Sequence, residues 1–250
     1  MGVDPLAARA WGVAADDYER GRPGWPADAV ASLVDRFGAT RVLDLAAGTG
    51  KLTRVLADHA ADVVAVEPLD GMRRQLEERL PHVRVLAGTA EAIPLGDGAV
   101  DAVFVAEAFH WFDLRRAVPE IARVLRPGGG LAVLWNRPGW EGLAWFDDLW
   151  AILGDHRNAG REHERGPWRD ALAADGRFAP LQEEEATHQQ TTDRERLLAM
   201  VASFSWIGGL PDDRRGATLA ACREVLERHE VDAVTLTYKT LITTTRRIDG

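Results

Sequence analysis

The chain has 250 residues and a mass of 27.4 kDa, which is enough for one sizeable hydrophobic core. Its 30 Lys and Arg residues and 39 Asp and Glu residues give a net charge of −9, which opposes attraction to phosphate backbones and disfavours DNA or RNA as a partner. No stretch reaches the ~18 apolar residues of a membrane span, and the single cysteine, Cys222, excludes an internal disulfide and a multi-cysteine metal site. We therefore expect a cytoplasmic protein with no metal, no membrane and no nucleic acid as partners.

Predicted helices and strands alternate through the first half of the chain. The first helix has Pro26 just inside its start and ends at Gly38, and a short buried strand over 42–46 follows it. The next predicted elements are a helix over 52–59, a strand over 63–67, a helix over 69–80, the third and fourth strand segments at 83–95 and 99–112, a helix over 114–124 that Pro119 kinks or begins, and a strand over 131–135 released by Gly128-Gly129-Gly130. This alternation predicts a mostly parallel sheet with helices on both faces.

The second half of the chain shows this pattern less clearly. Residues 137–175 predict a helical connection, and 178–190 predict a sixth strand despite three consecutive glutamates. Two helical patterns, 194–207 and 212–229, lie in a helical segment over 194–232, and a threonine-rich alternation over 235–244 predicts the last strand. No internal repeat or low-complexity linker is present, so one domain over 1–250 is expected.

A glycine-rich turn follows the first predicted strand, in the sequence RVLDLAAGTGKLT over 41–53. Small residues at such a turn let backbone N–H groups approach a ligand closely, so the turn predicts a site for a nucleoside-bearing cofactor. A dinucleotide fingerprint starting at Gly48 needs glycine at 53, where the chain has Thr53. A phosphate-binding P-loop needs glycine at 45 and Ser or Thr at 52, where the chain has Leu45 and Leu52. Both pyrophosphate-binding motifs are therefore disfavoured.

An acidic residue stands near the end of each of the first two predicted strands, Asp44 in the first and Glu67 in the second. If these strands are neighbours, a carboxylate at the end of the second can accept both hydroxyls of a ribose. Dinucleotide enzymes use an acid in the same way, so Glu67 alone does not separate the two classes. Both acids could instead cap the helices that follow them. The joint spacing of the acids and the glycine turn favours a binding site.

The segments 41–53, 63–72, 83–95, 99–112 and 123–136 resemble, in order and spacing, the motifs of class I S-adenosylmethionine-dependent methyltransferases. The resemblance covers residues 10–136 closely and the remainder loosely. It implies an α/β, Rossmann-like fold with a seven-stranded, mostly parallel sheet, helices on both faces, and a last strand inserted antiparallel between the fifth and sixth. It also implies S-adenosyl-L-methionine as cofactor and S-adenosyl-L-homocysteine as product.

By this resemblance, the cofactor contacts follow the ends of the first four strands. Asp44 would order the turn and favour a cationic ligand, Glu67 would bind the ribose, and Glu107 would lie beside the methionine amino group, with a solvated acid as the alternative. Thr89 stands where many family members have an aspartate beside the adenine, which leaves the backbone contacts there. The predicted cofactor-binding residues are Asp44, Ala46, Ala47, Gly48, Gly50, Glu67, Pro68, Leu69, Met72, Thr89, Ala90, Glu91, Ala106 and Glu107.

The predicted substrate side contains aromatic residues and a histidine. His110 follows the fourth strand and is interpreted as a general base for a hydroxyl acceptor or as a wall of the pocket. Within an N-terminal lid segment over 1–26, the stretch 18–26 resembles the lid of small-molecule methyltransferases similar to trans-aconitate methyltransferase, although 22–26 could be only a rigid surface turn. The predicted substrate-binding residues are Tyr18, Arg22, Trp25, His110, Trp111, Trp135 and Trp140, some of which could instead fill the core.

These observations predict a methyltransferase that acts on a small molecule at oxygen, either a carboxylate or a hydroxyl, as a monomer or homodimer. Three alternatives stay open at this point. The first is methylation at nitrogen or carbon, which the motifs do not separate from methylation at oxygen. The second is a catalytically silent protein that only binds S-adenosylmethionine. The third is a nucleotide-sugar or dinucleotide oxidoreductase built on a similar sheet.

Overall fold

The computed structural model describes residues 15–140, 142–154 and 165–248. The chain forms two compact units, each built from three pieces of sequence. Unit 1 comprises Met1–Gly24, Arg137–Gly160 and Thr187–Lys239, and unit 2 comprises Trp25–Asn136, Arg161–Ala186 and Thr240–Gly250. Three of the boundaries between the units fall inside strands. One domain over 1–250 stays a prediction.

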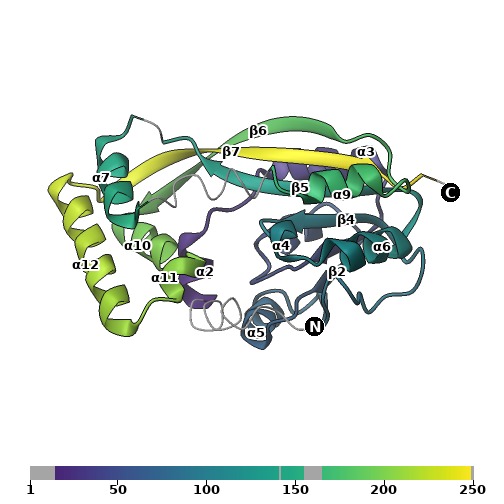
Figure 1. Cartoon of the computed structure of the whole chain (residues 1–250), viewed down its shortest axis with the longest axis horizontal. Helices are drawn as coiled ribbons and strands as arrows, with labels where there is room; N and C mark the ends of the chain where they lie inside the picture. The colour runs from purple at the N-terminus through teal and green to yellow at the C-terminus, as the bar shows by residue number, and fades with distance from the viewer. Residues whose placement is uncertain (1–14, 141, 155–164, 249–250) are drawn as a thin grey trace. The chain divides into compact units, whose positions relative to one another are not determined.

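A seven-stranded sheet runs through the described residues in the order β3-β2-β1-β4-β5-β7-β6 (Figure 1). The strands are β1 (Arg41–Leu45), β2 (Asp62–Val66), β3 (Arg84–Leu86), β4 (Val100–Ala106), β5 (Leu125–Pro138), β6 (Gln182–Asp193) and β7 (Ala233–Arg246). The pairs β1–β2, β2–β3, β1–β4 and β4–β5 are parallel, and β7 lies antiparallel between β5 and β6. The Rossmann-like fold class and the place of the last strand, both implied by the family resemblance, are confirmed.

The helices follow the predicted alternation in the first half of the chain and add a group of helices in the second. They are α2 (Ala15–Gly21), α3 (Ala27–Phe37), α4 (Lys51–Ala57), α5 (Asp70–Arg79), α6 (Leu114–Val124), α7 (Ala144–Leu153), α9 (Trp168–Ala174), α10 (Arg194–Ala202), α11 (Ser205–Gly208) and α12 (Asp212–Arg228), with a 3-10 turn, η1, at Phe109–Trp111. Gly38 ends α3 with a φ of 59°, as its predicted role as helix terminator requires. Pro119 lies inside α6, whose first turn is capped by Asp113, so the alternative that Pro119 begins the helix is wrong.

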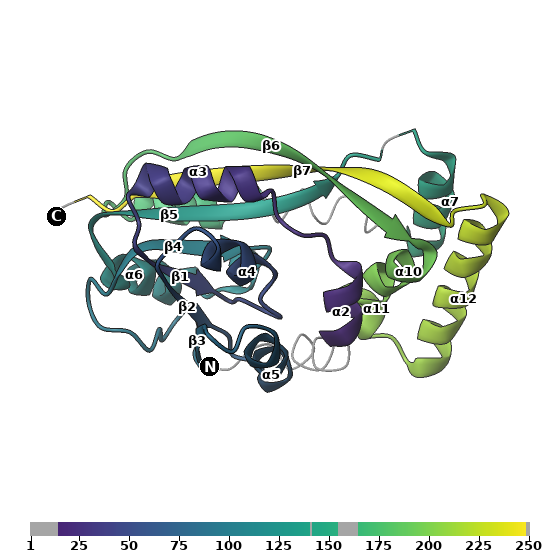
Figure 2. The ribbon, with the colours of Figure 1, turned by 180° about the vertical axis from the view of Figure 1, so that it is seen from behind.

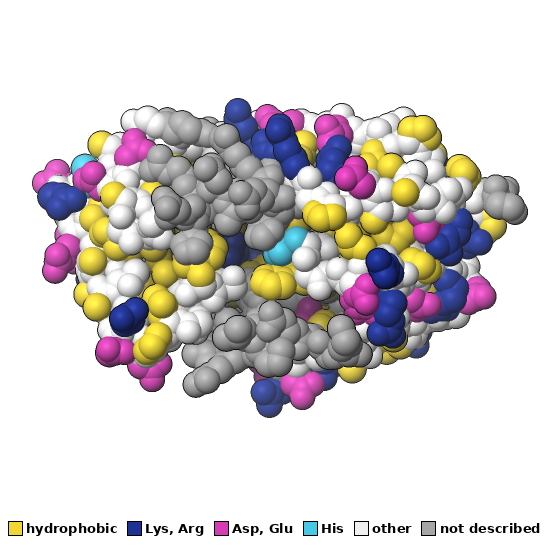
Figure 3. Space-filling model, in the orientation of Figure 1, with side chains coloured by type: hydrophobic (Ala, Val, Ile, Leu, Met, Phe, Trp, Pro, Cys, Tyr) yellow, Lys and Arg dark blue, Asp and Glu magenta, His cyan; other side chains and the backbone are white. Residues whose placement is uncertain are grey.

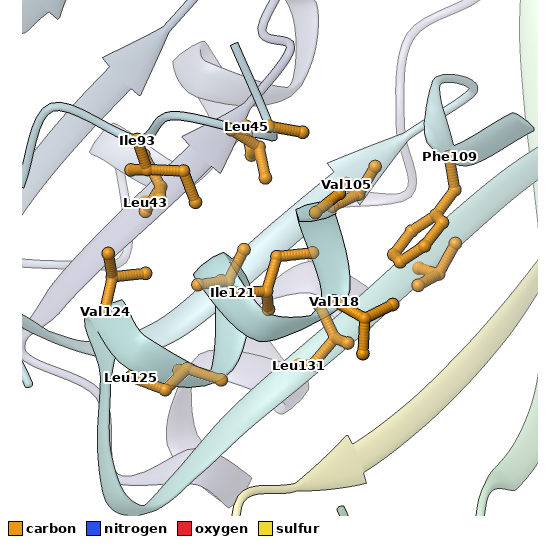
Figure 4. Close-up of a cluster of buried hydrophobic side chains, with 14 of the residues drawn as sticks. Leu43, Leu45, Ile93, Val105, Phe109, Val118, Ile121, Val124, Leu125 and Leu131 are labelled. Atoms are coloured by element: carbon orange, nitrogen blue, oxygen red, sulfur yellow. The ribbon is translucent and has the colours of Figure 1, made fainter. Parts of the chain in front are cut away.

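The two faces of the sheet in unit 2 are covered by different helices. Because side chains alternate along a strand, Leu43 and Leu45 face one way and Val42 the other. The first face packs against α6 and α9, and the second packs against α3 and α4 (Figures 1 and 2). Figure 4 shows the first of these clusters, in which Ile121 of α6 lies over strand residues such as Val105. The parallel pairing of β1 with β2 and with β4 places the carboxyl ends of the three strands at one edge of the sheet.

The starts of β5 and β6 differ most from the predicted starts. β5 begins at Leu125, before the three glycines, because Leu125 already pairs with Val100 of β4. Gly130 is part of the strand, and its backbone lies against Phe37, since an added Cβ would be 2.3 Å from that ring. The pairing of β5 with β4 is irregular at the other two glycines, Gly128 and Gly129. Val100 pairs with Leu125 and Ala102 pairs with Gly130, so the register shifts between these two pairs. β6 begins at Gln182, after a proline that cannot donate to the ladder.

Charged side chains of β6 stay in solvent because this strand is at the edge of the sheet. Glu184 pairs there with Arg36 of α3 at 2.6 Å, and Glu183 pairs with Arg169 of α9. Basic and acidic side chains are similarly interspersed on the face that Figure 3 draws. The edge position of β6 therefore explains how this strand can contain three consecutive glutamates.

Unit 1 has a core of its own. It is formed by side chains of α7, α10, α11 and α12, together with Trp140 and the first part of β7. Helix α2 packs closely on α10, because Gly21 lies directly against the backbone of Met200; an added Cβ would be 2.0 Å from the Met200 nitrogen. Gly21 therefore allows an approach between two helices that no larger residue permits.

Candidate functional site

The glycine-rich turn between β1 and α4 is the first part of the candidate site. Its backbone uses positive φ angles at Ala46 (60°), Gly48 (59°) and Gly50 (88°), and α4 begins at the next residue, Lys51. At Gly50 a Cβ would lie 2.9 Å from Cγ of Leu76 in α5, so only glycine fits without movement. The turn is a tightly packed, defined structure, as the sequence motif predicts.

Asp44 lies beneath this turn with 1% of its surface exposed. Its carboxylate accepts a hydrogen bond from Thr53 Oγ1 at 2.6 Å. Burial raises the pKa of Asp44 to about 7, hydrogen bonds from Thr53 oppose this rise, and the nearby charge of Glu67 adds to it. Because Thr53 is in the first turn of α4, Asp44 also supports the start of that helix, which the capping interpretation predicts.

Glu67 follows β2 and joins two turns. Its Oε2 accepts the Gly48 N–H at 2.9 Å and its Oε1 accepts the Leu69 N–H at 2.9 Å, with 4% of the residue exposed. Burial raises the pKa of Glu67, and these two hydrogen bonds and the charge of Arg73 oppose the rise. Each carboxylate oxygen has a second lone pair, so Glu67 can hold the turns together and still accept hydrogen bonds from a ligand diol.

The loops after β3 and β4 bring further predicted residues to the same unit. Glu91 accepts the backbone N–H of Asp113 at 2.8 Å and so connects the loop after β3 to the start of α6. Glu107, directly after β4, has a φ of 54° and accepts the Asn136 N–H at 2.6 Å. The Asn136 side chain in turn accepts a hydrogen bond from Thr240 of β7 at 2.5 Å. Asn136 and Thr240 were not predicted from the sequence, because nothing near them in the chain marks their partnership with Glu107.

The remaining predicted cofactor residues occupy these same turns. Pro68 and Leu69 form the turn between β2 and α5, and Leu69 is the N-cap of α5. Met72 is buried on α5. The others in the set are Ala47 in the glycine turn, Thr89 and Ala90 after β3, and Ala106 at the last position of β4. All of the predicted cofactor-binding residues therefore belong to unit 2.

Three of the predicted substrate residues contact one another in unit 2. The ring of His110 lies 4.6 Å from that of Trp111 and 5.4 Å from that of Trp135, measured between centroids. Trp111 is 44% exposed, His110 is half-buried, and Trp135 is 1% exposed. Trp168 of α9 stacks on Trp135 at 6.4 Å and was missed from the sequence, where it stands among polar residues far along the chain.

Comparisons with known proteins agree with this arrangement. A family model described as a methyltransferase domain matches residues 43–133, which cover β1 to the middle of β5. An uncharacterized methyltransferase of Mycobacterium tuberculosis (strain H37Rv) is 42% identical over 220 residues, which is 88% of this chain and 86% of that protein. The chain is a class I S-adenosylmethionine-dependent methyltransferase. The oxidoreductase alternative is therefore wrong.

Two further relatives of this methyltransferase extend the comparison. A malonyl-[acyl-carrier protein] O-methyltransferase of Methylococcus capsulatus is 31% identical over 204 residues, covering 79% of this chain and 70% of that protein. A solved structure titled as a putative type II methyltransferase from Anaeromyxobacter dehalogenans has a TM-score of 0.68 and 25% identity, covering 92% of this chain and 99% of that one. The cofactor of the methyltransferase is S-adenosylmethionine.

The residues of the glycine turn fit this cofactor. The backbone of the turn is free of bulky side chains, Glu67 has lone pairs for the two ribose hydroxyls, and two buried acids favour a cation over a diphosphate. S-adenosylmethionine supplies a methyl group that is already activated by a positively charged sulfur.

Among the described residues there is no group of three His, Cys, Asp or Glu side chains placed to hold a metal ion. The described helices include none with the length and apolar character needed to cross a membrane.

The other predicted substrate residues of the methyltransferase lie elsewhere. Trp25 packs against the α3 cluster of unit 2. Tyr18 and Arg22 belong to unit 1, where the Arg22 guanidinium lies 5.5 Å from the centre of the Tyr18 ring. Trp140, also in unit 1, is 1% exposed and packs edge-on against Tyr238 at 5.3 Å, which is a core position. The predicted substrate set is thus divided between the two units.

The raised pKa of Asp44 predicts that the two forms of the cofactor respond differently to pH. Below a pH of about 7 the Asp44 carboxyl is protonated, so it would carry no charge with which to attract a positive sulfur. We expect the affinity for S-adenosylmethionine to fall as the pH is lowered from 8.5 to 5.5, and the affinity for uncharged-sulfur S-adenosylhomocysteine to fall less. Calorimetry with both ligands measures the ratio. Asp44→Asn should make the ratio of the two affinities independent of pH. A ratio of the two affinities that does not change with pH in the wild-type protein would contradict the electrostatic role of Asp44.

Proposed function

We propose that this methyltransferase transfers the methyl group to an oxygen atom, a carboxylate or a hydroxyl, of a small molecule. The observation that carries the proposal is the position of His110 after β4, at the sheet edge where the turns after β1 and β2 also lie, with aromatic rings on two sides of it. An imidazole there suits an acceptor whose hydroxyl proton must be removed, and the rings suit an apolar or aromatic body.

Two further observations support this choice of acceptor. The Methylococcus capsulatus relative is named an O-methyltransferase, which favours oxygen over nitrogen or carbon. The net charge of −9 disfavours a nucleic acid substrate. The proposal includes a cytoplasmic enzyme that works as a monomer or homodimer.

Three acidic residues of the site would bind the cofactor, and His110 would take part in proton transfer. Glu67 would bind the ribose, Asp44 would favour the positive sulfur, and Glu107 would bind the methionine amino group. His110 would accept a hydroxyl proton, or would form a wall if the acceptor is already an anion. Holding the acceptor oxygen in line with the methyl–sulfur bond can supply ~7–11 kcal/mol of the barrier reduction, so positioning is the main task of the protein.

The test begins with isotopically labelled S-adenosylmethionine, the pure protein and a metabolite extract. Labelled products that are esters or ethers support the proposal, whereas labelled amines or carbon-methylated products contradict it. The rate with the identified acceptor is then measured against pH. A hydroxyl acceptor should show the ionisation of a base, and a carboxylate acceptor should not.

His110→Ala gives a separate prediction. We expect S-adenosylhomocysteine to bind within about twofold of the wild-type affinity, because the assigned cofactor contacts come from other residues. With a hydroxyl acceptor, turnover should fall by roughly 10²–10⁴-fold. His82→Ala, which removes an exposed histidine of the same unit, is the control and should change neither quantity. A loss of cofactor affinity in His110→Ala alone would show that His110 belongs to the cofactor site.

A further inference from the structure

The side chain of Glu107, directly after β4, completes the pairing of β4 with β5. The Glu107 N–H donates to the Leu134 carbonyl oxygen at 3.0 Å, as it would in a regular parallel ladder. The next N–H of that ladder, from Asn136, would then meet the Glu107 carbonyl oxygen, but it donates to Glu107 Oε1 at 2.6 Å. The carboxylate therefore takes the place in the ladder that a backbone oxygen fills in a regular strand.

The backbone of Glu107 explains this exchange. Its φ of 54° lies in the left-handed region, which turns the chain out of the strand conformation. A residue other than glycine is strained there, and it keeps this conformation only where its surroundings hold it. The bonds to Leu134 and Asn136 hold both the backbone and the side chain of Glu107. The position of the carboxylate is therefore set by the part of β5 that passes beside it.

Asn136 is in turn fixed by a buried hydroxyl group. It lies beyond Leu134, the last residue of β5 that pairs with β4. Thr240 Oγ1 donates to Asn136 Oδ1 at 2.5 Å, and Thr240 is 0% exposed on β7, the neighbour of β5 in the sheet. A buried hydroxyl is costly unless it is hydrogen-bonded, so folding strongly favours this contact. The contact anchors Asn136, whose N–H then stays directed at Glu107.

These hydrogen bonds form one chain across three strands. The chain runs from the Thr240 hydroxyl on β7, through Asn136 on β5, to the Glu107 carboxylate after β4, and all three residues belong to unit 2. Hydrogen bonds between a carboxylate and an ammonium group are strong, and their strength depends on geometry. A contact that fixes the carboxylate can therefore change the affinity for an amine without contacting it.

We propose that Thr240 is a positioning residue of the cofactor site, which acts through Asn136 to hold the Glu107 carboxylate where it binds the amino group of S-adenosylmethionine. This inference rests on the proposed function, which assigns that amino group to Glu107. It adds two residues that no motif in the sequence indicates. Because Thr240 acts only through Glu107, its loss should weaken ligands that carry the amino group and spare a ligand without it.

The test compares S-adenosylhomocysteine with its desamino analogue, which lacks only the amino group. Both are titrated by calorimetry into the full chain and its variants. We expect Thr240→Val to weaken binding of S-adenosylhomocysteine by about fivefold, an effect typical of one neutral hydrogen bond, and to change binding of the analogue by less than about twofold. Thr240→Ser keeps the hydroxyl and should retain most of the affinity. Glu107→Gln, which removes the charge, should show the same selectivity with a loss of about tenfold or more.

Thr245→Val is the matched control. Thr245 also lies on β7 in unit 2, is 5% exposed, and donates from Oγ1 to the Ala179 carbonyl oxygen at 2.6 Å. Each of the two valine variants removes one buried hydroxyl hydrogen bond from the same strand, so urea unfolding should show a similar loss of stability in both. Only Thr240→Val should change the ratio of the two affinities.

Three results would overturn the role of Thr240: an unchanged affinity for both ligands in Thr240→Val, an equal loss for both, or the same change of ratio in Thr245→Val. If one of these occurs while Glu107→Gln is selective for the amino group, the proposed function is retained and only this inference fails. If Glu107→Gln weakens both ligands equally, Glu107 does not bind the amino group, and the assignment in the proposed function fails together with the inference.

Discussion

Glu67→Gln should reduce the affinity for S-adenosylhomocysteine by roughly 100-fold or more, measured by calorimetry at pH 8. The Glu67 carboxylate accepts N–H groups from the turns after β1 and β2, and we propose that it also accepts the ribose hydroxyls. Glutamine has one acceptor oxygen, and its amide group would face a backbone N–H with another donor. We also expect a loss of about 1–3 kcal/mol in the free energy of unfolding, from the buried N–H that loses its acceptor.

Glu120→Gln is the matched control for this change. The Glu120 carboxylate likewise accepts a backbone N–H, from Ile93 at 3.0 Å, but it lies on α6 among residues with no predicted role in cofactor binding. We expect Glu120→Gln to lower the free energy of unfolding, as measured by urea unfolding, and to leave the affinity for S-adenosylhomocysteine unchanged. Equal losses of affinity in both variants would show that the effect of Glu67 is only structural.

Gly50→Ala should destabilise the protein and abolish most cofactor binding. Two costs add at this position: a φ of 88°, which L-residues rarely adopt, and a Cβ placed 2.9 Å from Cγ of Leu76. The first costs about 1–2 kcal/mol, and the second moves the turn or α5, which also carries Met72. Urea unfolding and a thermal shift with S-adenosylhomocysteine measure the two effects.

Gly38→Ala is the control that separates the backbone strain from the steric contact. Gly38 has a φ of 59°, and nothing lies within 4 Å of an added Cβ, so this variant has the backbone cost alone. We expect it to lose about 1 kcal/mol of stability and to keep its cofactor affinity. If Gly50→Ala destabilises the protein no more than Gly38→Ala and binds the cofactor normally, the tight packing of the turn has no part in binding.

Much of unit 2 follows from local signals in the sequence. The continuous buried run of β1, the helix terminator Gly38 and the glycine turn before α4 each depend on residues within a few positions of one another. The parallel order of the strands then places Asp44 and Glu67 at one edge of the sheet. The predicted elements and the family resemblance are therefore most accurate where short-range patterns and topology agree.

Other parts depend on residues that are distant in the chain. The predicted start of β5 is six residues too late, because the pairing of Leu125 with Val100 cannot be inferred from three consecutive glycines. The hydrogen bond between Asn136 and Thr240 joins residues 104 apart, and that between Arg22 and Ser203 joins residues 181 apart. No periodicity indicates such pairs, so the substrate side was the less predictable one.

The division of β5, β6 and β7 between the units has a consequence for protein engineering. Unit 1 consists of separate pieces, so a chimaera that exchanges all of it needs junctions inside strands, where a mismatch breaks ladder hydrogen bonds. The piece 194–232, between the end of β6 and the start of β7, needs only two junctions. It carries α10, α11 and α12, so exchanging it between relatives changes most of the core of unit 1 without a junction inside a strand.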